Sequence, residues 1–431
     1  MKFRVNANVF AKILTPVFDV STKKGIKDFE TNNLVCVTAN SDEIIAKSFN
    51  GYTAIKSTLT NLSFSDLKYE FEKEGSVIIN IKDFIKILNS FKPGTELAIE
   101  LEEDNGTRLK FWDVDAESDT QILPVLSNAD NMTFPQKLTK ENKKITIDKN
   151  VFIDGASRIL FAHGDQESQR KFMNWVLRVD KDAEKIRFGA GTGGIFAFLD
   201  TWGKDFLTTN KSCDFLFPNK QTAIFLSVIS ATKYDKIDII EKVNDDLSSS
   251  QIVIDCQDHE IILIGLNSGM DWVDEGRFLD KTKEYKVVTK TSDWLYPMKG
   301  ILATVNDDVK RQSDPHGVEI SFDDANKNIF LNADYIMKSS RKIDFIESKV
   351  INGQAFDEKY NFISKTFHVN QVIDKFNKDY SMQIEVIDSR SPILVYDFAD
   401  QAVSDSAPSR LNEKTGLMES FFVFFTTMLE K

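Results

Sequence analysis

Apolar residues recur six times along the chain at the spacing of an amphipathic helix. Ile81, Phe84, Ile85 and Leu88 fall at positions i, i+3, i+4 and i+7, which places all four on one helix face. The six helices are predicted near 10–17, 81–88, 152–160, 224–229, 298–305 and 369–376. They form three pairs spaced by about 140–150 residues, and recurrence at a long fixed period is typical of an internally repeated protein. The pattern predicts three similar domains, each with two helices.

Between the predicted helices, short runs of β-branched and alternating residues predict strands. These runs lie at 34–38, 44–49, 76–79, 96–102, 108–112, 175–179, 186–188, 195–199, 318–322, 329–333 and 382–387. Asn50-Gly51 separates two of them and predicts a tight hairpin turn. Helices combined with neighbouring antiparallel strands place the chain in the α+β class.

Polar stretches mark the joins between the repeats. Residues 137–144 and 280–286 are rich in lysine and other polar residues, which is typical of exposed linkers or sheet edges. We therefore expect domains at 1–138, 139–284 and 285–431. In the third domain, 404–420 predicts a long mobile loop, and the apolar run 421–429 predicts a final strand.

Composition excludes several classes of protein. No apolar run approaches the ~20 residues that a membrane span needs, and the N-terminal segment lacks the pattern of a secretory signal. The three cysteines are scattered without a CxxC pair, and the four histidines are dispersed, so we expect neither a disulfide framework nor a metal site. A cytoplasmic protein without a cofactor is the simplest expectation.

The chain is acidic, with a net charge of −12 and a pI of about 5.1. Simple duplex-binding proteins usually carry a basic footprint instead. A nucleic-acid function therefore requires a locally basic face on an otherwise acidic protein.

Two motifs that resemble ligand loops do not meet their structural requirements. Gly189–Gly194 fits GxGxxG, but the strand-like run 195–199 follows it where a dinucleotide site needs a helix. Asp113–Asp119 resembles the start of a calcium loop, yet Ser118 stands in place of the turn glycine and Pro124 in place of the final glutamate. We interpret both as turns.

Two histidines have acidic neighbours in the sequence, His163 with Asp165 and His259 with Asp258. No nucleophile motif accompanies either pair, and adjacency along the chain is not catalytic geometry. We expect surface or partly buried histidines and no enzymatic activity.

Basic residues recur beside the predicted helices. Lys82 and Lys86 lie four positions apart on the face of their helix opposite the apolar one. Comparable residues are Lys23, Lys24, Arg158, Arg170, Lys171, Lys310, Arg311, Lys375 and Lys378. Each alone is most simply a solvated side chain, but together they could form a positive lining that follows phosphates without reading bases.

Several segments, in this order, resemble a bacterial-type DNA polymerase sliding clamp, the β subunit or processivity factor. They are Met1–Phe3, Ile81–Gly94, Leu123–Leu126, Phe134-Pro135, Ala162–Asn174, Thr192–Gly194, Phe367–Val372 and Ile387–Pro392. The resemblance spans essentially the whole chain. It rests on the order of the segments and the threefold spacing rather than on one specific motif.

The resemblance implies three clamp domains with inward-facing helices and outer sheets, and a head-to-tail dimeric ring around duplex DNA. Such a ring tolerates an acidic exterior, needs no catalytic residue or cofactor, and binds DNA polymerase and the clamp loader through short hydrophobic peptides. The implied location is the cytoplasm of a bacterium or of a phage-infected host.

The resemblance also assigns site residues. The DNA-binding residues would be Lys23, Lys24, Lys82, Lys86, Arg158, Gln166, Arg170, Lys171, Lys310 and Arg311. The peptide pocket would comprise Met173, Thr192, Gly194, Ile195, Phe196, Ser389, Ser391, Pro392, Thr427, Met428 and Leu429. The subunit interface would comprise Gln121, Ile122, Leu123, Ile301 and Leu302.

The chain departs from the family in ways that predict a different peptide preference. It has Ile195-Phe196 where the family has His-Arg, and its C-terminal segment differs from the family's Met-Pro-Met-Arg-Leu. Extra residues at 113–119, 241–250 and 404–420 lengthen it, as in a divergent, phage-encoded clamp. Two other functions stay open, a clamp-like scaffold for transcription or recombination factors and a β-rich structural or carbohydrate-binding protein. The scattered tryptophans favour core packing over a sugar site.

Overall fold

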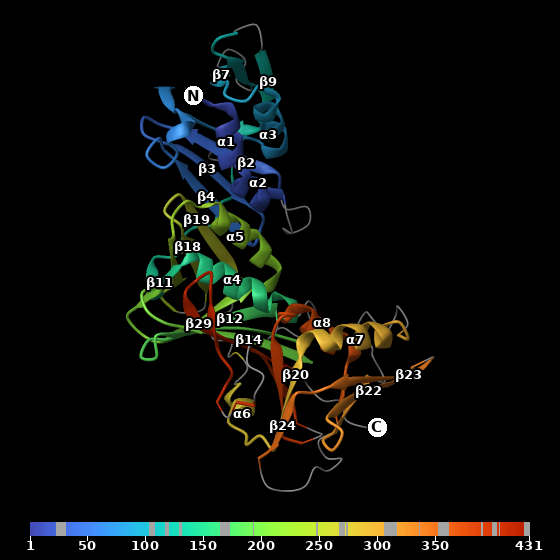
Figure 1. The fold of residues 1–431 in the computed structure, drawn as a ribbon. Coiled ribbons are helices and arrows are strands. Elements are labelled where there is room, and N and C mark those ends of the chain that lie inside the picture. Colours follow the sequence, from blue (N-terminus) through green and yellow to red (C-terminus); the bar gives the residue numbers. More distant parts are fainter. Residues whose placement is uncertain are drawn as a thin grey trace. The chain divides into compact units, whose positions relative to one another are not determined.

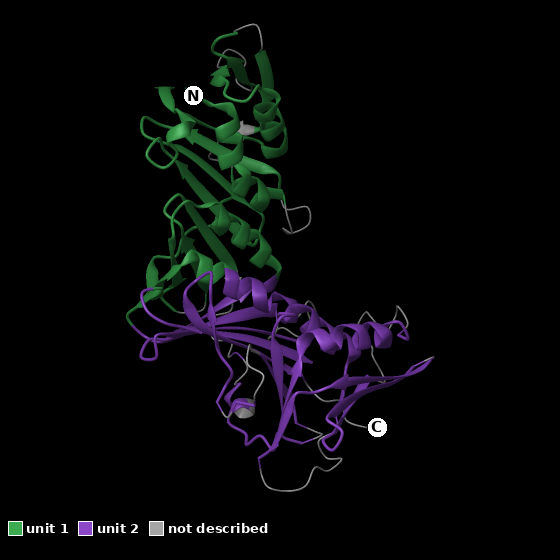
Figure 2. Cartoon of the chain, in the orientation of Figure 1, with its two compact units in different colours: residues 1–153, 206–210, 220–269 green, residues 154–205, 211–219, 270–431 purple. Residues whose placement is uncertain are grey.

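The structure is a computed structural model that divides into two compact units (Figure 2). Its described residues are 1–22, 32–102, 108–116, 120–128, 132–163, 173–192, 194–246, 249–266, 272, 275–305, 317–335, 337–351, 362–388, 391–398, 403–404 and 406–425. Unit 1 comprises residues 1–153, 206–210 and 220–269, and unit 2 comprises 154–205, 211–219 and 270–431. The segment predicted as a second domain therefore contributes to both units.

The six predicted helical segments are all helical (Figure 1). The first contains two helices, α1 (Ala7–Ile13) and α2 (Thr15–Thr22). The others are α3 (Ile81–Ser90), α4 (Lys149–Ile159), α5 (Asn219–Ala231), α7 (Leu295–Leu302) and α8 (Thr366–Lys375). A short helix that the sequence did not predict, α6, covers Gly276–Leu279.

Helix α3 illustrates why these segments are helical. The Asn80 side chain accepts hydrogen bonds from the backbone N–H groups of Lys82 (3.0 Å) and Asp83 (3.3 Å), which caps the helix N-terminus. Phe84 and Leu88 are fully buried, and burial of each such side chain stabilises the fold by about 1.5–3 kcal/mol. The amphipathic pattern therefore fixes both the helix and the face that it buries.

Unit 1 contains two antiparallel sheets. The five-stranded sheet has the order β5 (Glu70–Lys73), β1 (Lys2–Asn6), β7 (Glu96–Glu102), β8 (Arg108–Asp113) and β9 (Thr120–Pro124). The ten-stranded sheet has the order β10 (Ser127–Asn128), β6 (Gly75–Asn80), β2 (Leu34–Ala39), β3 (Ile44–Phe49), β4 (Thr53–Leu59), β19 (His259–Leu266), β18 (Ser250–Asp255), β17 (Lys236–Val243), β11 (Lys140–Asp148) and β15 (Leu207–Thr209). The helices of unit 1 gather along one side of these strands (Figure 1).

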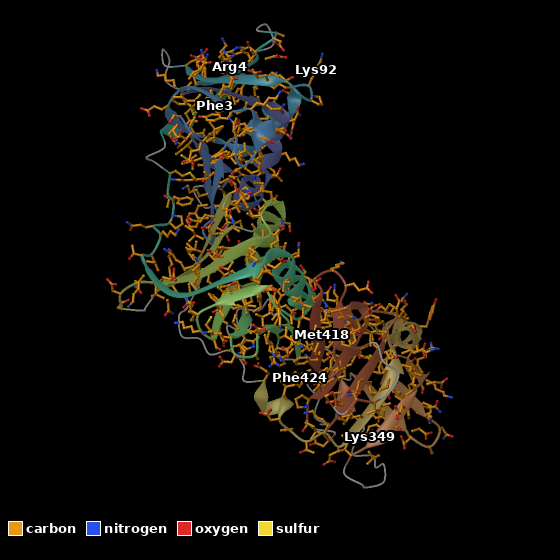
Figure 3. All side chains as sticks on the ribbon, turned by 60° about the vertical axis from the view of Figure 1, so that its left-hand side comes forward. Phe3, Arg4, Lys92, Lys349, Met418 and Phe424 are labelled. Atoms are coloured by element: carbon orange, nitrogen blue, oxygen red, sulfur yellow. The ribbon has the colours of Figure 1, made fainter. Side chains whose placement is uncertain are left out.

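Aromatic packing builds the core beneath the five-stranded sheet. The rings of Phe3, Phe10, Phe84 and Phe111 follow one another with centroid distances of 6.2, 5.7 and 5.7 Å. Phe3 lies inside unit 1, whereas the neighbouring Arg4 reaches its surface (Figure 3). Alternation along β1 thus separates the core from solvent.

Unit 2 also contains two antiparallel sheets. The larger has the order β16 (Cys213–Pro218), β12 (Asn174–Asp180), β13 (Lys185–Gly191), β14 (Ile195–Trp202), β29 (Leu417–Phe425), β27 (Ile393–Phe398), β26 (Ser381–Val386), β20 (Tyr285–Lys290) and β24 (Glu347–Val350), and β28 (Arg410–Asn412) also pairs with β29. The smaller has the order β23 (Lys338–Asp344), β22 (Asn328–Asp334), β21 (Val318–Asp323) and β25 (Phe362–Ser364).

The larger sheet of each unit joins strands from both sides of a predicted domain boundary. In unit 1, Ile55 of β4 pairs with Ile261 of β19. In unit 2, Ala197 of β14 pairs with Val423 of β29. The predicted repeats are therefore joined by continuous sheets, and the division at 138 and 284 stays a prediction.

Two turn predictions are confirmed. Asn50-Gly51 connects β3 to β4, and Gly51 has a φ of 91°, which favours glycine. The GxGxxG segment connects β13 to β14 rather than a strand to a helix. A Cβ at Gly191 would lie 2.3 Å from Phe196, so this glycine gives room to an aromatic ring.

The prediction of a loop over 404–420 is wrong for part of that segment, because β28 and the start of β29 lie within it. Gly416 has a φ of 69° and donates a backbone hydrogen bond of 2.8 Å to Asn412, closing the tight turn between the two strands. The final strand was correctly predicted from 421 to 425, and residues 426–429 lie outside the described part of the chain.

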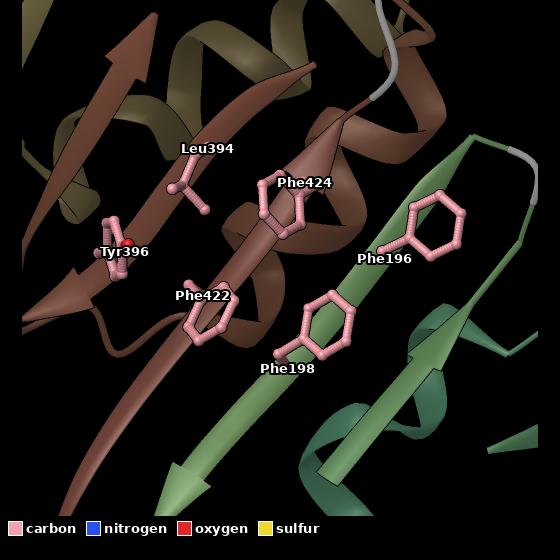
Figure 4. Packing of buried hydrophobic residues seen from close by; sticks show 6 residues of the cluster. All are labelled: Phe196, Phe198, Leu394, Tyr396, Phe422 and Phe424. Carbon is pink, nitrogen blue, oxygen red and sulfur yellow. The ribbon is translucent and has the colours of Figure 1, made fainter. Parts of the chain in front are cut away.

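A cluster of five aromatic residues and one leucine covers one face of the central strands of unit 2 (Figure 4). Phe198 of β14 stacks on Phe422 of β29 with a centroid distance of 5.4 Å. The cluster consists of Phe196, Phe198, Leu394, Tyr396, Phe422 and Phe424. Its members are two positions apart on each strand, so all point to the same face.

Candidate functional site

Two segments predicted for the peptide pocket, 192–196 and 391–392, lie at one end of the large sheet of unit 2, on either side of the end of β29. Ile195 of β14 and Ile393 of β27 both pair with Phe425 of β29, from opposite sides. Adjacent strands lie about 4.8 Å apart, so the two isoleucines are about 10 Å apart. The turn before Ile195, residues 391–392 and the end of β29 therefore lie side by side, although they are far apart in sequence.

The turn that carries Thr192 and Gly194 is fixed by local hydrogen bonds. Thr192 Oγ1 accepts from the N–H groups of Gly194 (3.1 Å) and Ile195 (3.2 Å), and the Thr192 N–H donates to the Ile195 carbonyl (2.8 Å). Val176 pairs with Gly189, and extending this register places Met173 at the same sheet end. Thr192, Gly194 and Met173 are half-buried, so they border this site.

Three other predicted pocket residues are buried and do not expose their side chains at the site. Ile195 and Phe196 are buried, so their side chains pack inside the unit. The Ser391 hydroxyl donates to Asp388 Oδ2 (2.9 Å), and its N–H donates to Asp388 Oδ1 (2.7 Å). Ser391 thus shapes the turn between β26 and β27, while Pro392 stays half-buried beside it.

His368, in the first turn of α8, is a residue of this site that the sequence analysis did not assign. A Cβ at Gly194 would lie 2.3 Å from His368 Cε1, so the imidazole ring occupies the space above the glycine. The neighbouring Phe367 exposes much of its ring. No local sequence signal marks His368, because the approach of α8 to the β13–β14 turn is a tertiary contact.

Many of the predicted site residues lie outside the described part of the chain. From the DNA-binding set these are Lys23, Lys24, Gln166, Arg170, Lys171, Lys310 and Arg311. From the peptide pocket they are Ser389, Thr427, Met428 and Leu429.

Exposed lysines lie on helices of both units. Lys82 and Lys86 project from α3 into solvent, and Lys86 Nζ lies 3.3 Å from Asp83. Further exposed lysines on helices are Lys12, Lys220, Lys299 and Lys375. Lys12, Lys220 and Lys299 were not identified from the sequence. Every repeat thus carries a helix with a solvated positive charge.

Arg158 has a different environment from these lysines. Its Nη1 lies 2.8 Å from Glu419 Oε1, its Nη2 lies 3.9 Å from Asp397 Oδ2, and its side chain is only 20% exposed. Burial alone would raise the pKa of Glu419, but the charges and hydrogen bonds of Arg158 and Arg410 outweigh it and lower that pKa. Arg158 is therefore paired with buried carboxylates, unlike the exposed lysines on the helices.

The predicted interface residues lie on an edge strand, β9, or on a helix, α7, that packs against another edge strand, β23. Strand β9 is an edge of its sheet and exposes Ile122 (50%), whereas Leu123 points into the core. Strand β23 is the edge of the small sheet and packs against α7. On α7, Ile301 is buried, Leu302 is half-buried and Tyr296 is 82% exposed. Gln121 of β9 is also half-buried.

The two histidines with acidic neighbours are held by structural contacts. His259 Nδ1 lies 2.8 Å from Ser57 Oγ, both residues are buried, and burial lowers the pKa of His259. His163 contacts the Leu160 carbonyl. Within the described residues, no cluster of three or more metal-ligating side chains occurs, and no helix is both long and apolar enough to cross a membrane.

Known proteins with this architecture identify the fold. The chain matches the DNA polymerase β subunit of Streptococcus pyogenes with a TM-score of 0.76 at 13% identity, over 100% of both chains. The fold is that of a DNA polymerase sliding clamp. The Bacillus subtilis sliding clamp gives a TM-score of 0.75 at 11% identity, again over 100% of both chains. The α+β clamp fold expected from the sequence is thereby confirmed.

A third clamp of the same fold was crystallised with a ligand. The Pseudomonas aeruginosa DNA polymerase III β subunit bound to griselimycin matches with a TM-score of 0.74 at 13% identity, over 100% of both chains. No protein-family model matches the chain. No curated protein matches it by sequence either. The clamp fold of this chain is thus visible in its structure, although its sequence is only 11–13% identical to those of these three clamps.

Proposed function

We propose that this protein is a sliding clamp that encircles duplex DNA and tethers a DNA polymerase, without catalysing a reaction itself. The observation that carries the proposal is that the chain follows the clamp fold over its whole length, with 100% coverage in both directions. A fold made of repeated helix pairs and continuous sheets suits a closed ring, because the sheets provide a rigid frame.

The DNA contact in this proposal is electrostatic and independent of sequence. Lys82 and Lys86 on α3, with the exposed lysines on the other helices, would face the phosphates. Lys23, Lys24, Gln166, Arg170, Lys171, Lys310 and Arg311 would extend this lining. Retention by a closed ring needs only weak contacts, which is compatible with a net charge of −12.

The ring in this proposal forms from two identical chains, each with clamp domains at 1–138, 139–284 and 285–431. The exposed edge of β9 would pair with the exposed edge of β23 of a second copy, because edge strands present unpaired N–H and C=O groups. Ile122 and the half-buried Leu302 would pack across this contact. The buried Leu123 and Ile301 would support it from within each chain.

The partner site in this proposal is the sheet end bordered by Met173, Thr192, Gly194 and Pro392. A polymerase or clamp loader would insert a short hydrophobic peptide there, and residues 389 and 427–429 would complete the site. The ring of His368 above Gly194 fills part of this region, which favours a peptide different from that of other clamps. The cytoplasm of a bacterium or of a phage-infected cell is the corresponding location.

The proposal is tested by oligomeric mass and by retention on DNA. The protein should form an oligomer that stays on nicked circular DNA after loading and slides off when the circle is cut. Ile122→Asp should yield monomers, whereas Leu62→Asp, a change at another exposed side chain (94%), should not. A monomeric wild type whose retention ignores DNA topology would overturn the proposal.

A further inference from the structure

A short segment between the second and third predicted repeats packs over the aromatic cluster of unit 2. It comprises residues 275–284 and includes α6, and we name it the cover segment. Leu279, at the end of α6, packs against the cluster, whose six side chains Figure 4 shows on one face of the strands. The chain thereby supplies an occupant for its own aromatic face.

The covered face is continuous with the proposed peptide site. Phe196 and Phe424 lie opposite each other on β14 and β29, one residue away from Ile195 and Phe425 at the sheet end where that site lies. Leu394 of β27 pairs with Phe424 from the other side. A hydrophobic peptide at this sheet end therefore lies next to the face that the cover segment occupies.

Glu275 anchors the other end of the cover segment. Its Oε1 accepts from Arg178 and, at 2.8 Å, from Arg187, and these arginines lie opposite each other on β12 and β13. Burial would lower the pKa of Arg187, but Asp200 and Glu275 outweigh burial and raise that pKa, so the guanidinium stays charged. This guanidinium also lies 5.4 Å from the ring centroid of Phe422, so the charged position adjoins the aromatic cluster.

The cover segment satisfies this position incompletely. Both arginines bind one oxygen of Glu275, and its Oε2 is buried without a hydrogen-bond partner within the described residues. An unpaired buried acceptor disfavours the covered state. Leu279 is only half-buried on the cluster, and α6 is a single turn, which is too short to be stable by itself. These features favour a cover that a better ligand displaces.

The sheet keeps partners for its arginines when the cover segment leaves. Arg178 Nε lies 3.2 Å from Asp214 Oδ2, and Arg187 Nη2 donates to Asp200 Oδ2 at 2.7 Å. Departure of Glu275 therefore leaves each arginine with one carboxylate instead of two, and neither becomes an isolated buried charge. The uncovered state is accessible, and it offers two guanidinium groups to a new carboxylate.

We propose that the cover segment is a self-ligand that blocks the peptide site, and that a partner peptide displaces it by supplying the same two groups. The peptide carries a carboxylate for Arg178 and Arg187. Four positions later, one helical turn away, it carries a leucine or another large apolar side chain, as in Glu275 and Leu279. The inference rests on the proposed function, because it assigns an autoinhibitory cover to the peptide site of that clamp.

The cover segment itself supplies the probe for a test. A labelled peptide with the sequence of residues 275–284 is titrated into the full-length wild type and into Leu279→Ser, and binding is followed by fluorescence anisotropy. The tethered copy occupies the wild-type site at a local concentration in the millimolar range, so the free peptide should bind weakly. Leu279→Ser weakens the tethered copy and should increase peptide affinity by about ten-fold. Equal affinities would overturn the proposal.

A second variant acts at the other end of the cover segment. Glu275→Gln removes the charge that the two arginines bind and should give an increase of similar size. Asp280→Asn, a matched control at an exposed position of the same segment, should leave the wild-type affinity unchanged. An increase with Asp280→Asn equal to that with Glu275→Gln would contradict the assignment of Glu275.

An altered peptide separates a specific site from an exposed apolar face that binds any peptide. The peptide that carries both Glu275→Gln and Leu279→Ser should bind the Leu279→Ser protein at least about ten-fold more weakly than the unaltered peptide. Tight binding of the altered peptide would mean non-specific adhesion and would contradict the proposal.

Arg178→Gln, added to the Leu279→Ser protein, tests the position that cover and peptide share. Arg178 is half-buried, so this change is compatible with folding. It should remove most of the gain in peptide affinity, because the free peptide needs the same guanidinium as the tethered copy. An unchanged gain would refute the role of this arginine.

The clamp function is measured separately on the same proteins. Leu279→Ser should keep the oligomeric mass and the retention on nicked circular DNA expected of the wild type. A variant that forms this ring but gains no peptide affinity would refute the self-ligand and leave the clamp proposal intact. A gain in peptide affinity in a protein that forms no ring would support the self-ligand and refute the clamp proposal alone.

Discussion

Arg158 on α4 donates a hydrogen bond of 2.8 Å to Glu419, a residue 261 positions further along the chain. The bond ties the first helix of the second predicted repeat to the strand at the centre of the large sheet of unit 2. Glu419 is 2% exposed and also accepts a hydrogen bond of 2.7 Å from Arg410 Nε, so loss of Arg158 would leave this buried carboxylate with one arginine instead of two.

Arg158→Met should therefore lower the free energy of unfolding by about 1.5–3 kcal/mol, the usual contribution of a hydrogen bond to a charged group, because Arg410 still pairs with Glu419. Urea unfolding would measure it. Lys82→Met removes an exposed charge and should change stability by less than about 0.5 kcal/mol. A stable Arg158→Met variant that has lost only its DNA retention would contradict the structural role of Arg158.

Asp397 should make stability fall as pH rises from about 4 to about 6. Its pKa is about 6 in the folded chain and about 3.9 in the unfolded chain, so the folded state binds more protons in this window. The contribution is at most about 3 kcal/mol, from about two pKa units at 1.36 kcal/mol each. Urea unfolding of wild type and Asp397→Asn at several pH values measures it. Parallel stability curves for the two proteins would show that Asp397 does not titrate in this range.

Gly155→Ala should destabilise unit 2 although alanine is the better helix former. Alanine gains about 1 kcal/mol of helix propensity, but its Cβ would lie 2.3 Å from the ring of Phe188, which is fully buried. Overpacking of this kind costs about 1–3 kcal/mol. Thermal unfolding of Gly155→Ala, alone and with Phe188→Leu, would check it. The smaller leucine should restore part of the loss, and a stabilised single variant would mean that α4 and β13 can separate.

Gly194→Ala should displace the ring of His368, because the new Cβ would lie 2.3 Å from His368 Cε1. His368 is a side chain at the start of α8 that can turn away, so we expect a stability loss of about 1 kcal/mol but a larger change in binding of a partner peptide. Fluorescence titration with a hydrophobic clamp-binding peptide measures this. In a His368→Ala background, Gly194→Ala should have little effect on either quantity, and an unchanged penalty there would rule out this contact as its cause.

Lys82→Gln with Lys86→Gln should reduce the dependence of DNA binding on salt. Each phosphate contact contributes about 0.9 to the slope of log K against log salt, so the slope should fall by up to about 2. Binding of a short duplex at several salt concentrations measures it. Lys290→Gln is a matched control from β20. An unchanged slope would mean that α3 does not contact DNA.

The sequence alone determined the local elements of this protein. The spacing of apolar residues such as Phe84 and Leu88 fixed the helices, because the period of 3.6 residues is a property of one segment. The apolar run 195–199 likewise predicted a strand after Gly194, and this local pattern identified the GxGxxG segment as a turn between strands. The order of these segments along the chain was enough to predict the clamp fold, even where few residues are shared.

Only the tertiary structure decided which segments meet. The sequence placed Arg158 among DNA-binding residues, because a helix pattern cannot reveal that Glu419 and Asp397 arrive from distant strands. The contact of His368 with Gly194, the pairing of β28 with β29 and the packing of the cover segment on the aromatic cluster were hidden in the same way. Each depends on residues far apart in sequence whose approach is set by packing of whole sheets and helices, and no local period records that packing.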